Sequence, residues 1–275
     1  MGVTRRDFLR SATAISVGAL AGVGAYGAAY ERHQIVKIAR DLPVRGLPPA
    51  LDGLRIGMIT DVHHSAVVSA EDVTRAVMLL KDSSPDIVVL GGDYVSFFDR
   101  TYVAPVAELL APLANAPQGS FAVLGNHDDE KEMPAALASR GFTVLKDQRT
   151  KLTIRGERLD IAGIRFWTKT VGDMAAALKG TGGTTILLAH DPRRLVEAAS
   201  LDVQLVLSGH THGGQVVLPG LGALAGRKFP VLAGSAQKEN TSIFVSRGVG
   251  TVYVPVRINC PPDVALLTLR REGIA

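Results

Sequence analysis

Five short apolar runs in the sequence are each followed directly by a polar cluster. The runs are rich in Ile, Val and Leu and do not alternate with polar residues, which is typical of strands buried on both faces. Helical patterns lie between several of them, so we expect a sheet flanked by helices, an α/β architecture. The runs are Leu54–Thr60, Ile87–Leu90, Phe121–Leu124, Thr185–Ala189 and Val203–Ser208.

The polar clusters carry oxygen and imidazole donors and no thiolate. Ligands of open α/β sheets bind at the carboxyl ends of the strands, where these clusters fall. A single Asp after a strand is commonly a helix N-cap, but burying all of these groups unpaired would be very unfavourable. Together they indicate a site for a divalent ion such as Mn, Fe, Co or Zn. The clusters are Asp61-Val62-His63, Gly91-Gly92-Asp93, Gly125-Asn126-His127-Asp128, Ala189-His190-Asp191 and Gly209-His210-Thr211-His212.

Composition and charge narrow the class of protein. The chain of 275 residues is 47% apolar and 20% charged, which excludes disordered and collagenous proteins. Cys260 is the only cysteine, so no internal disulfide can form. Residues 1–40 hold six Lys and Arg against two acidic residues, which accounts for the whole net charge of +4. The neutral remainder offers no bulk attraction to nucleic acid, so we do not expect a nucleic-acid partner.

The N-terminus has the order of an export signal. Arg5 and Arg6 precede Phe8-Leu9, and Ser11 to Tyr30 contains no charge. This order resembles a twin-arginine signal, which implies the twin-arginine export machinery as a partner and a periplasmic or cell-envelope location. The alternative is an ordinary surface helix with an arginine pair. Small residues around 25–29 offer a cleavage site, whereas an uncleaved leader would anchor the protein in the membrane. We therefore divide the chain into a leader, residues 1–40, and a body, residues 41–275.

Further elements are predicted outside the five runs. Ser69 and Asp72 form a capping-box pattern that opens a helix to about Ser83. Asp191 and Pro192 are suited to the N-cap and first position of a second helix. The remaining predictions are a hairpin over Leu152–Ile164, strands over Ile243–Val245, Val252–Val256 and Val264–Leu269, and an irregular loop over Leu218–Gln237 that walls the cleft.

The five clusters follow the pattern D-x-H, G-D, G-N-H-D/E, H and G-H-x-H. In this the chain resembles the calcineurin-like metallophosphoesterase superfamily, over most of the body from Asp61 to His212. A second resemblance, to exported bacterial members, rests on Ser246–Gly250 and the tail Pro255–Asp263. The resemblance implies a four-layer α-β-β-α sandwich with a dimetal site at the carboxyl ends of the strands.

The resemblance also implies how the metals are held. One ion is expected on Asp61, His63 and His212, and the other on Asn126, His190 and His210. Asp93 is expected to bridge two divalent ions of Mn, Fe or Zn, with a hydroxide between them as the nucleophile.

Other residues are candidates for roles around the metals. His127 is expected to be the general acid or a cation that stabilises phosphoryl charge, with Asp128 either orienting it or capping a helix. Tyr94, Arg227, Lys228 and Arg257 are candidate substrate contacts, against the alternatives of core packing for Tyr94 and solvated charge for the cations. His64 is expected to be solvated or to lie behind the ligands. Cys260 is expected to be structural, and Trp167 to be in the core.

Three functions stay open at this point. The first is a phosphodiesterase acting on a phosphate diester or pyrophosphate, including lipid-linked or cell-wall-linked substrates. The second keeps the chemistry but changes the substrate, as a monoester phosphatase or nucleotidase, a nuclease, or a pyrophosphatase acting on nucleotide-linked lipid precursors. The third is a non-catalytic envelope-binding protein that retains the fold, which the complete ligand set argues against.

Overall fold

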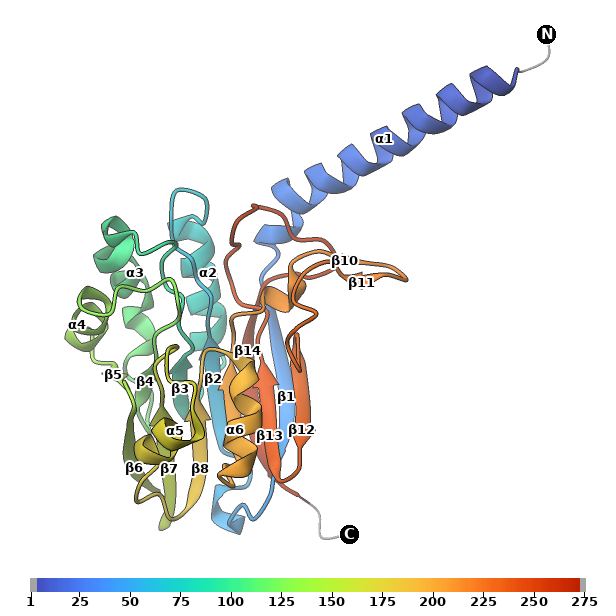
Figure 1. The fold of residues 1–275 in the computed structure, drawn as a ribbon. Helices are drawn as coiled ribbons and strands as arrows, with labels where there is room; N and C mark the ends of the chain where they lie inside the picture. The colour runs from blue at the N-terminus through green and yellow to red at the C-terminus, as the bar shows by residue number, and fades with distance from the viewer. Residues whose placement is uncertain (1–3, 273–275) are drawn as a thin grey trace.

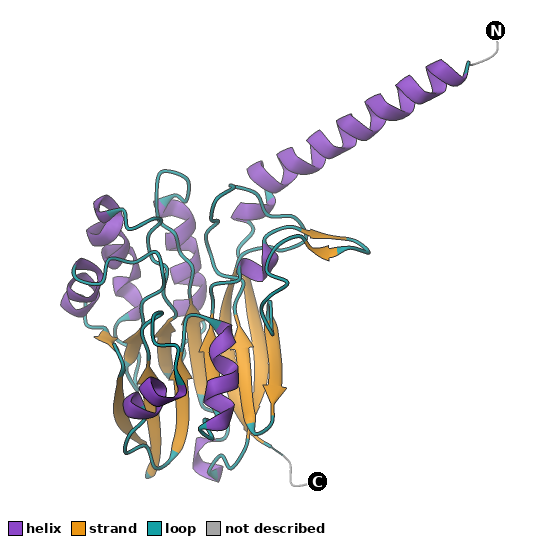
Figure 2. Ribbon diagram, viewed as in Figure 1, coloured by secondary structure: helices purple, strands orange, loops and turns teal. Residues whose placement is uncertain are grey.

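Two six-stranded sheets pack face to face in the computed structural model, which describes residues 4–272 (Figures 1 and 2). The first sheet has the order β1-β14-β2-β3-β4-β5. Its strands are β1 (Val36–Val44), β14 (Asp263–Arg271), β2 (Arg55–Ile59), β3 (Ile87–Leu90), β4 (Ser120–Ala122) and β5 (Thr143–Val144).

The second sheet has the order β12-β13-β9-β8-β7-β6. Its strands are β12 (Gly234–Lys238), β13 (Thr241–Val245), β9 (Leu205–Ser208), β8 (Thr184–Leu188), β7 (Glu157–Gly163) and β6 (Gln148–Ile154). A separate two-stranded hairpin, β10 (Val217–Leu218) with β11 (Gly222–Ala223), projects beyond the sheets (Figure 1).

Helices cover the outer face of each sheet. The first sheet packs against α2 (Ala70–Lys81), α3 (Val103–Leu110) and α4 (Glu132–Ser139), and the second against α5 (Val171–Ala177) and α6 (Leu195–Ser200). Three apolar layers result, one between the sheets and one under each set of helices. The fold is therefore the expected four-layer α-β-β-α sandwich. Single 3-10 turns lie at Glu31–His33, Pro49–Leu51, Arg100–Tyr102, Ala111–Leu113, Pro192–Arg194 and His212–Gly214.

Strand β3 shows why the apolar runs do not alternate. Ile87 and Val89 face the layer between the sheets, whereas Val88 and Leu90 face the layer under the helices. Each residue of the strand therefore meets an apolar layer, and a polar residue at any of the four positions would be buried.

The parallel pairings bring the polar clusters to one edge of the molecule. β2, β3 and β4 are parallel neighbours in the first sheet, as are β8 and β9 in the second. Parallel strands end on the same side of their sheet, so the loops that follow these five strands meet.

Most predicted elements are confirmed, with small shifts at their ends. Ser69 caps α2 by accepting a hydrogen bond from the backbone N–H of Asp72, although the helix ends at Lys81. Asp191 accepts from the N–H of Arg193, and a 3-10 turn precedes α6. The hairpin is β6–β7, and the last predicted strand is β14.

The strand predicted over Val252–Val256 is wrong. Tyr253 has a φ of +62°, in the left-handed region, and the Gln215 side chain occupies the backbone N–H of Val252 and the carbonyl of Val254. A segment held in this way cannot join a sheet ladder. The Leu218–Gln237 loop is irregular only in part, because it includes the end of β10, all of β11 and most of β12.

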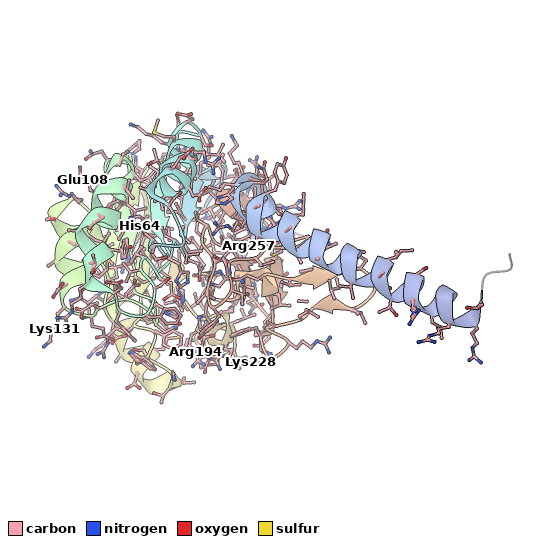
Figure 3. All side chains as sticks on the ribbon, turned by 90° about the horizontal axis from the view of Figure 1, so that it is seen from above. His64, Glu108, Lys131, Arg194, Lys228 and Arg257 are labelled. Carbon is pink, nitrogen blue, oxygen red and sulfur yellow. The ribbon has the colours of Figure 1, made fainter. Side chains whose placement is uncertain are left out.

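The N-terminal segment is one long helix, α1 (Arg5–Ala29), that projects away from the sandwich (Figures 1 and 3). Its apolar stretch is long enough to cross a membrane. The expected boundary at residue 40 falls inside β1, which begins at Val36 and pairs in parallel with β14. The body therefore begins before residue 36, because removing residues 36–40 would strip half of a sheet strand.

The junction after α1 is built into the body. Glu31 is buried and accepts a hydrogen bond from the backbone N–H of Cys260 (2.6 Å). His33 Nδ1 lies 2.9 Å from Asp72 of α2. At Gly27 an added Cβ would lie 2.5 Å from the carbonyl oxygen of Arg257, so the last turns of α1 contact the body directly.

Candidate metal centre

Seven side chains follow the ends of five parallel strands. Asp61 and His63 follow β2, Asp93 follows β3 and Asn126 follows β4, all in the first sheet. His190 follows β8, and His210 and His212 follow β9, in the second sheet. The two sheets thus contribute complementary halves of one site.

The backbone at five of these residues is left-handed. Their φ values are +50° at Asp61, +49° at His63, +55° at Asp93, +70° at His210 and +52° at His212. A residue other than Gly is uncommon in this region, and such strain clusters at functional sites because the surroundings hold it in place. Here the backbone N–H groups of Asp61 and His63 donate to the carbonyls of Gly92 and Asp93, at 2.9 and 3.0 Å.

One group of ligand atoms belongs to Asp61, His63 and His212, all buried, with the three atoms within 4.8 Å of one another. His63 Nε2 and His212 Nε2 are 3.2 Å apart, and His212 Nε2 is 3.4 Å from Asp61 Oδ1. The resemblance assigns the first ion to this same trio.

A second group belongs to Asp93, His190 and His210, again within 4.8 Å. His190 Nε2 lies 3.1 Å from Asp93 Oδ2, and His190 Nδ1 lies 2.8 Å from the carbonyl oxygen of Gly91, to which it can donate. A hydrogen bond of this kind at the second ring nitrogen fixes the tautomer of a metal-binding imidazole.

Asp93 stands between the two groups. Its Oδ2 faces His190 Nε2 of the second group and is 3.6 Å from His63 Nε2 of the first. Its Oδ1 accepts a hydrogen bond from the backbone N–H of His127 (2.8 Å), which orients the carboxylate. This is the position that a bridging ligand needs.

The buried polar groups strongly perturb one another's protonation. Burial disfavours the carboxylate of Asp93, yet the neighbouring His190 and His63 hold its pKa well below its ordinary value. Burial also opposes the charged form of His190, but Asp93 outweighs this effect and raises the pKa of His190 to about 10. Burial raises the pKa of Asp61 to about 6, an effect that His190 partly offsets.

The other three imidazoles are held neutral. Burial lowers the pKa of His63 to about 4 and, with the repulsion of His190, that of His210 to about 3. Burial and the neighbouring His63 lower the pKa of His212 as well. Neutral imidazole is the form that binds a metal ion.

Unpartnered buried atoms test whether metal ions fit the site. Asn126 Oδ1, at the ligand cluster, is one of several buried polar atoms of the described residues that have no hydrogen-bond partner. An unpaired buried polar atom is unfavourable, and a bound cation would satisfy this amide oxygen. With carboxylate, amide and imidazole donors, the set suits divalent Mn, Fe or Zn.

Two glycines allow the ligand loops to approach closely. An added Cβ at Gly125 would lie 2.0 Å from Asp93 Oδ1, and at Gly209 it would lie 2.2 Å from Asp61 Oδ2. A side chain at either position would displace a carboxylate, which is the reason that glycine is required there.

His127 lies beside the ligands, but Asp128 does not orient it. The Nδ1 of His127 accepts a hydrogen bond from the backbone N–H of Phe97 (3.1 Å), and its ring packs edge-on against His63. Asp128 instead accepts from the backbone N–H groups of Asp93 (2.8 Å), Tyr94 (2.8 Å) and Gly125 (2.9 Å). The helix-cap alternative is also wrong, because α4 begins at Glu132.

The role expected for Asp128 is therefore replaced by another. Its buried carboxylate ties the loop after β3 to the loop after β4, so it positions Asp93 and Asn126 together. Burial and the nearby Asp93 raise the pKa of Asp128 to about 7.

Two candidate substrate contacts are corrected. Tyr94 is fully buried, with its hydroxyl 2.7 Å from the carbonyl of Val123 and 3.1 Å from that of Leu90, so it is a core residue. Arg257 is fully buried as well, and its guanidinium donates to the carbonyls of Arg247 (2.8 Å) and Gly250 (2.6 Å). It locks the loop after β13, near the base of α1 (Figure 3), and it does not line the cavity next to the metal ligands.

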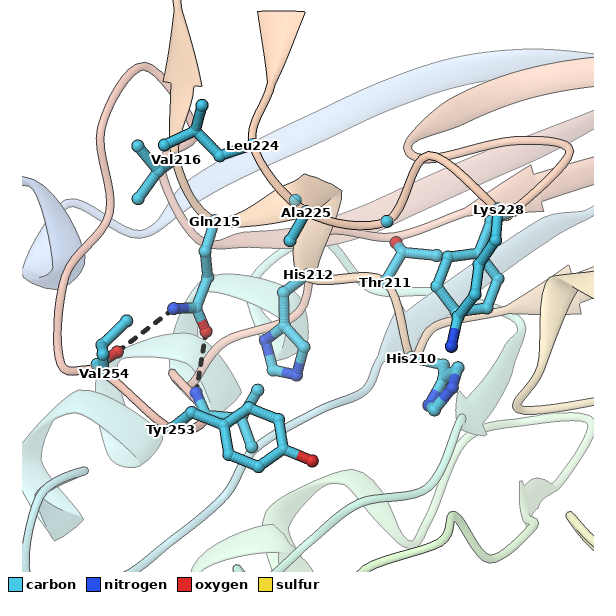
Figure 4. A pocket seen from close by; sticks show the side chains of 14 residues that line it. His210, Thr211, His212, Gln215, Val216, Leu224, Ala225, Lys228, Tyr253 and Val254 are labelled. Atoms are coloured by element: carbon cyan, nitrogen blue, oxygen red, sulfur yellow. Dashed lines mark hydrogen bonds between the residues drawn. The ribbon is translucent and has the colours of Figure 1, made fainter.

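Of the two candidate cations Arg227 and Lys228, only one lies at the site. Arg227 is exposed and does not line the cavity next to the metal ligands, whereas Lys228 does. Lys228 therefore stays a candidate substrate contact (Figure 4).

The structure also tests the expectations for His64, Cys260 and Trp167. His64 is buried, with Nδ1 2.9 Å from the carbonyl of Val68, so it packs behind the site and is not solvated. Cys260 is structural, since its thiol donates to the carbonyl of His212 (3.3 Å). Trp167 is 56% exposed, so placing it in the core was wrong.

Four residues at the site escaped the sequence analysis. Phe97 holds His127 through its backbone N–H, and Ser96 Oγ lies 3.3 Å from His63 Nδ1. Tyr253 packs near both Phe97 and His127, with ring centroids 5.7 and 6.4 Å apart. Gln215 holds the loop that carries Tyr253. Ser96 and Phe97 follow Asp93 closely, which was a usable signal, but Tyr253 and Gln215 are brought in only by the tertiary fold.

Comparison with known proteins agrees with this geometry. The calcineurin-like phosphoesterase family matches residues 54–214. An uncharacterized metallophosphoesterase of Bacillus subtilis, YkuE, is 31% identical over 281 residues, 98% of each chain. The phosphodiesterase YaeI of Escherichia coli is 32% identical over 228 residues, 78% of this chain and 82% of that protein.

Two further relatives bear on the leader and the fold. A zebrafish transmembrane protein with a metallophosphoesterase domain is 30% identical over 98% of this chain and 64% of its own length. Among solved structures, the NAD nucleotidase of Haemophilus influenzae matches with a TM-score of 0.50 and 17% identity over 71% of this chain and 50% of that one. At that identity the likeness concerns the fold alone.

Proposed function

The chain belongs to the calcineurin-like phosphoesterase family, and from that premise we propose that it is a phosphodiesterase working with two divalent ions of Mn, Fe or Zn. The observation that carries the proposal is the carboxylate of Asp93, whose Oδ2 faces a histidine from each of the two ligand groups. Asp61, His63 and His212 would hold one ion, and Asn126, His190 and His210 the other. When bound, such a pair lowers the pKa of water and neutralises phosphoryl oxygens.

Hydrolysis of a diester needs a proton at the leaving group. An oxygen of water forms a bond to phosphorus, the P–O bond to the leaving alcohol breaks, and the alcohol departs with a proton. His127 is suited to bind the leaving oxygen in this step. Because Nδ1 accepts from the Phe97 N–H, the neutral ring carries its proton on Nε2, which can donate a hydrogen bond to that oxygen while the alcohol takes up the proton that the attacking water releases.

Two cavities favour a diester over a monoester. Each has a volume of about 540 Å³, and Val252, Tyr253 and Val254 border both. One is lined by His210 and His212, and the other by Ser96 and Phe97 on the His127 side. A phosphodiester carries two substituents on phosphorus, so it can fill both cavities. The Escherichia coli relative, named a phosphodiesterase, supports the same choice.

We further propose that the chain is exported by the twin-arginine route and stays in the membrane through α1. The Arg5-Arg6 pair and the apolar helix support the route. The close contact between Gly27 of α1 and Arg257 of the body supports an uncleaved helix. Cleavage around residues 25–29 would remove this contact or expose it to solvent. The zebrafish relative, named a transmembrane protein, supports membrane attachment.

The test uses the full chain in lipid vesicles, stripped with a chelator and reloaded with Mn, Zn or Fe. Rates on bis(p-nitrophenyl) phosphate are compared with rates on p-nitrophenyl phosphate. We expect metal-dependent cleavage that favours the diester and is abolished by Asp93→Asn. The exposed Asp173→Asn is a matched control that keeps the activity. Preference for the monoester would replace the proposal with a phosphatase, and turnover in Asp93→Asn would overturn the dimetal assignment.

A further inference from the structure

The cavity beside His210 and His212 is lined mostly by apolar side chains, with Thr211, Gln215 and Lys228 as its polar residues besides the two histidines (Figure 4). Its walls include no carboxylate, and Lys228 is its one charged side chain outside the histidines. The apolar lining residues are Val216, Leu224, Phe229, Val252, Tyr253 and Val254. An apolar chamber that opens onto a centre for phosphate chemistry is suited to a substrate with an aliphatic part.

The loop that forms one wall of the cavity is fixed by hydrogen bonds. Gln215 is buried, and its side chain donates to the carbonyl of Val254 (3.1 Å) and accepts from the backbone N–H of Val252 (2.8 Å). Gln215 and Tyr253 both have left-handed backbone, with φ of +54° and +62°. The strained loop is thus fixed by a buried amide, which preorganises the cavity.

The same loop meets α1. Three residues after Val254, the backbone N–H of Arg257 donates to the carbonyl of Gly27 in α1 (3.2 Å). The β10–β11 hairpin projects on the side where α1 leaves the body, and it carries the exposed Leu221 and Leu224 (Figure 1). A bilayer that holds α1 therefore comes close to the apolar cavity.

Lys228 supplies charge complementarity. Its ammonium lies 5.4 Å from the centre of the Phe229 ring, which in turn packs on His210 at 5.3 Å. A cation at this edge matches the negative charge of a phosphodiester placed at the metal ligands.

We propose that this cavity binds the aliphatic chain of a membrane-lipid phosphodiester. The proposal rests on the phosphodiesterase function above and names its substrate class. The lipid chain occupies the cavity next to His210 and His212, and the leaving group occupies the cavity on the His127 side. The products are a lipid phosphate monoester, which keeps its chain, and the released alcohol.

The experiment compares methyl, butyl and octyl p-nitrophenyl phosphodiesters with the metal-loaded full chain in phosphatidylcholine vesicles. All three release the same p-nitrophenol, so only the alkyl group differs. We expect kcat/KM to rise by roughly fourfold for each methylene that enters the cavity. The octyl-to-methyl ratio is the quantity compared between variants.

Leu224→Asp places a carboxylate in the cavity wall, at a position that is 56% exposed and therefore tolerates the charge. We expect the octyl-to-methyl ratio to fall by at least about tenfold. Leu221→Asp is the matched control, because Leu221 is on the same hairpin, is exposed and does not line the cavity. Its ratio should equal that of the wild type. Partition of the longer esters into vesicles is the same for all variants and cancels in this comparison.

The outcomes separate the two proposals. If the methyl ester is cleaved but the ratio is near one, or is equal in Leu224→Asp and the wild type, the lipid-chain site is wrong and the phosphodiesterase stands. If no diester is cleaved, the affinities of octylphosphonate and methylphosphonate are measured by calorimetry. This measurement tests the lipid-chain site independently of catalysis. Tighter binding of the octyl compound that Leu224→Asp removes supports the cavity assignment, and equal binding overturns it.

Discussion

The Nε2 atoms of His63 and His212 face each other at 3.2 Å, 149 residues apart in the sequence. Both rings are buried, and both are held neutral. Two imidazole nitrogens at this distance, with Asp61 Oδ1 3.4 Å from one of them, converge as ligands do around a cation.

Metal removal should therefore lower the thermal stability of the protein. An ion present at 100 times its dissociation constant stabilises the folded state by about 2.7 kcal/mol, which corresponds to a fall of roughly 5–10 °C in Tm when it is removed. Scanning calorimetry with and without a chelator measures the shift. His212→Ala should show a smaller shift, and an equal Tm for the stripped and loaded wild type would contradict the prediction.

Gly209→Ala should weaken metal binding without unfolding the protein. The new methyl group would lie 2.2 Å from Asp61 Oδ2 and would push this carboxylate away from its fellow ligands His63 and His212. We expect a loss of about 10- to 100-fold in metal affinity, measured by titration of the stripped protein. Gly172→Ala is the control, since no atom outside its chain neighbours comes closer than 3.9 Å there. Equal affinities in the two variants would refute the steric argument.

Asp128→Ala should lower the stability of the fold. It should not remove a proton-transfer step from the reaction. The substitution leaves the backbone N–H groups of Asp93, Tyr94 and Gly125 buried without their acceptor, each worth about 1–3 kcal/mol. Urea unfolding should show a loss of at least about 3 kcal/mol. The shape of the pH–rate profile should not change, and a missing limb of that profile would instead assign proton transfer to Asp128.

His127→Ala should lower the rate most for poor leaving groups. A hydrogen bond to the leaving oxygen matters little for p-nitrophenol and much for an alkyl alcohol, so we expect a loss of about 10²- to 10³-fold with alkyl leaving groups and a smaller loss with p-nitrophenol. A series of diesters with leaving groups of graded pKa measures the slope. A uniform loss across the series would leave His127 with a purely electrostatic role.

Acid should loosen the junction between α1 and the body. Burial opposes ionisation of Asp72, but hydrogen bonds from His33, Arg75 and Ser69 outweigh it and lower the pKa of Asp72 below its ordinary 3.8. A carboxyl with a lower pKa in the folded state stabilises the fold above its unfolded pKa and loses that stabilisation as the pH falls through its folded pKa.

Unfolding free energies measured from neutral pH down to below pH 3.8 should therefore fall more steeply for the wild type than for Asp72→Asn. Asp173→Asn, at a more exposed carboxyl, serves as the comparison. Identical slopes in the wild type and Asp72→Asn would show that this carboxylate does not hold the junction.

The sandwich was predictable because its strands are buried on both faces. In β3, Ile87 and Val89 face one apolar layer and Val88 and Leu90 face the other. The sequence does not tell which residue faces which layer, but a continuous apolar run indicates that both faces of the strand are buried. The strand order was not predictable from such runs, since β14, from the end of the chain, lies between β1 and β2.

The ligand clusters were predictable because each follows its strand at once. What failed depends on contacts between distant segments. Tyr94 and Arg257 are polar residues near polar motifs, and only the fold reveals that backbone carbonyls surround their polar groups. The strand predicted over Val252–Val256 failed for the same reason, since Gln215 takes the hydrogen-bonding groups that a ladder would use.

The division of the ligands between two sheets has a consequence for the order of events in folding. Asp61, His63, Asp93 and Asn126 come from one sheet, and the three histidines of the other half come from the second. Neither sheet alone presents the complete set, so full coordination of either ion requires the two sheets to be docked. Metal affinity should therefore report on the docking of the two sheets.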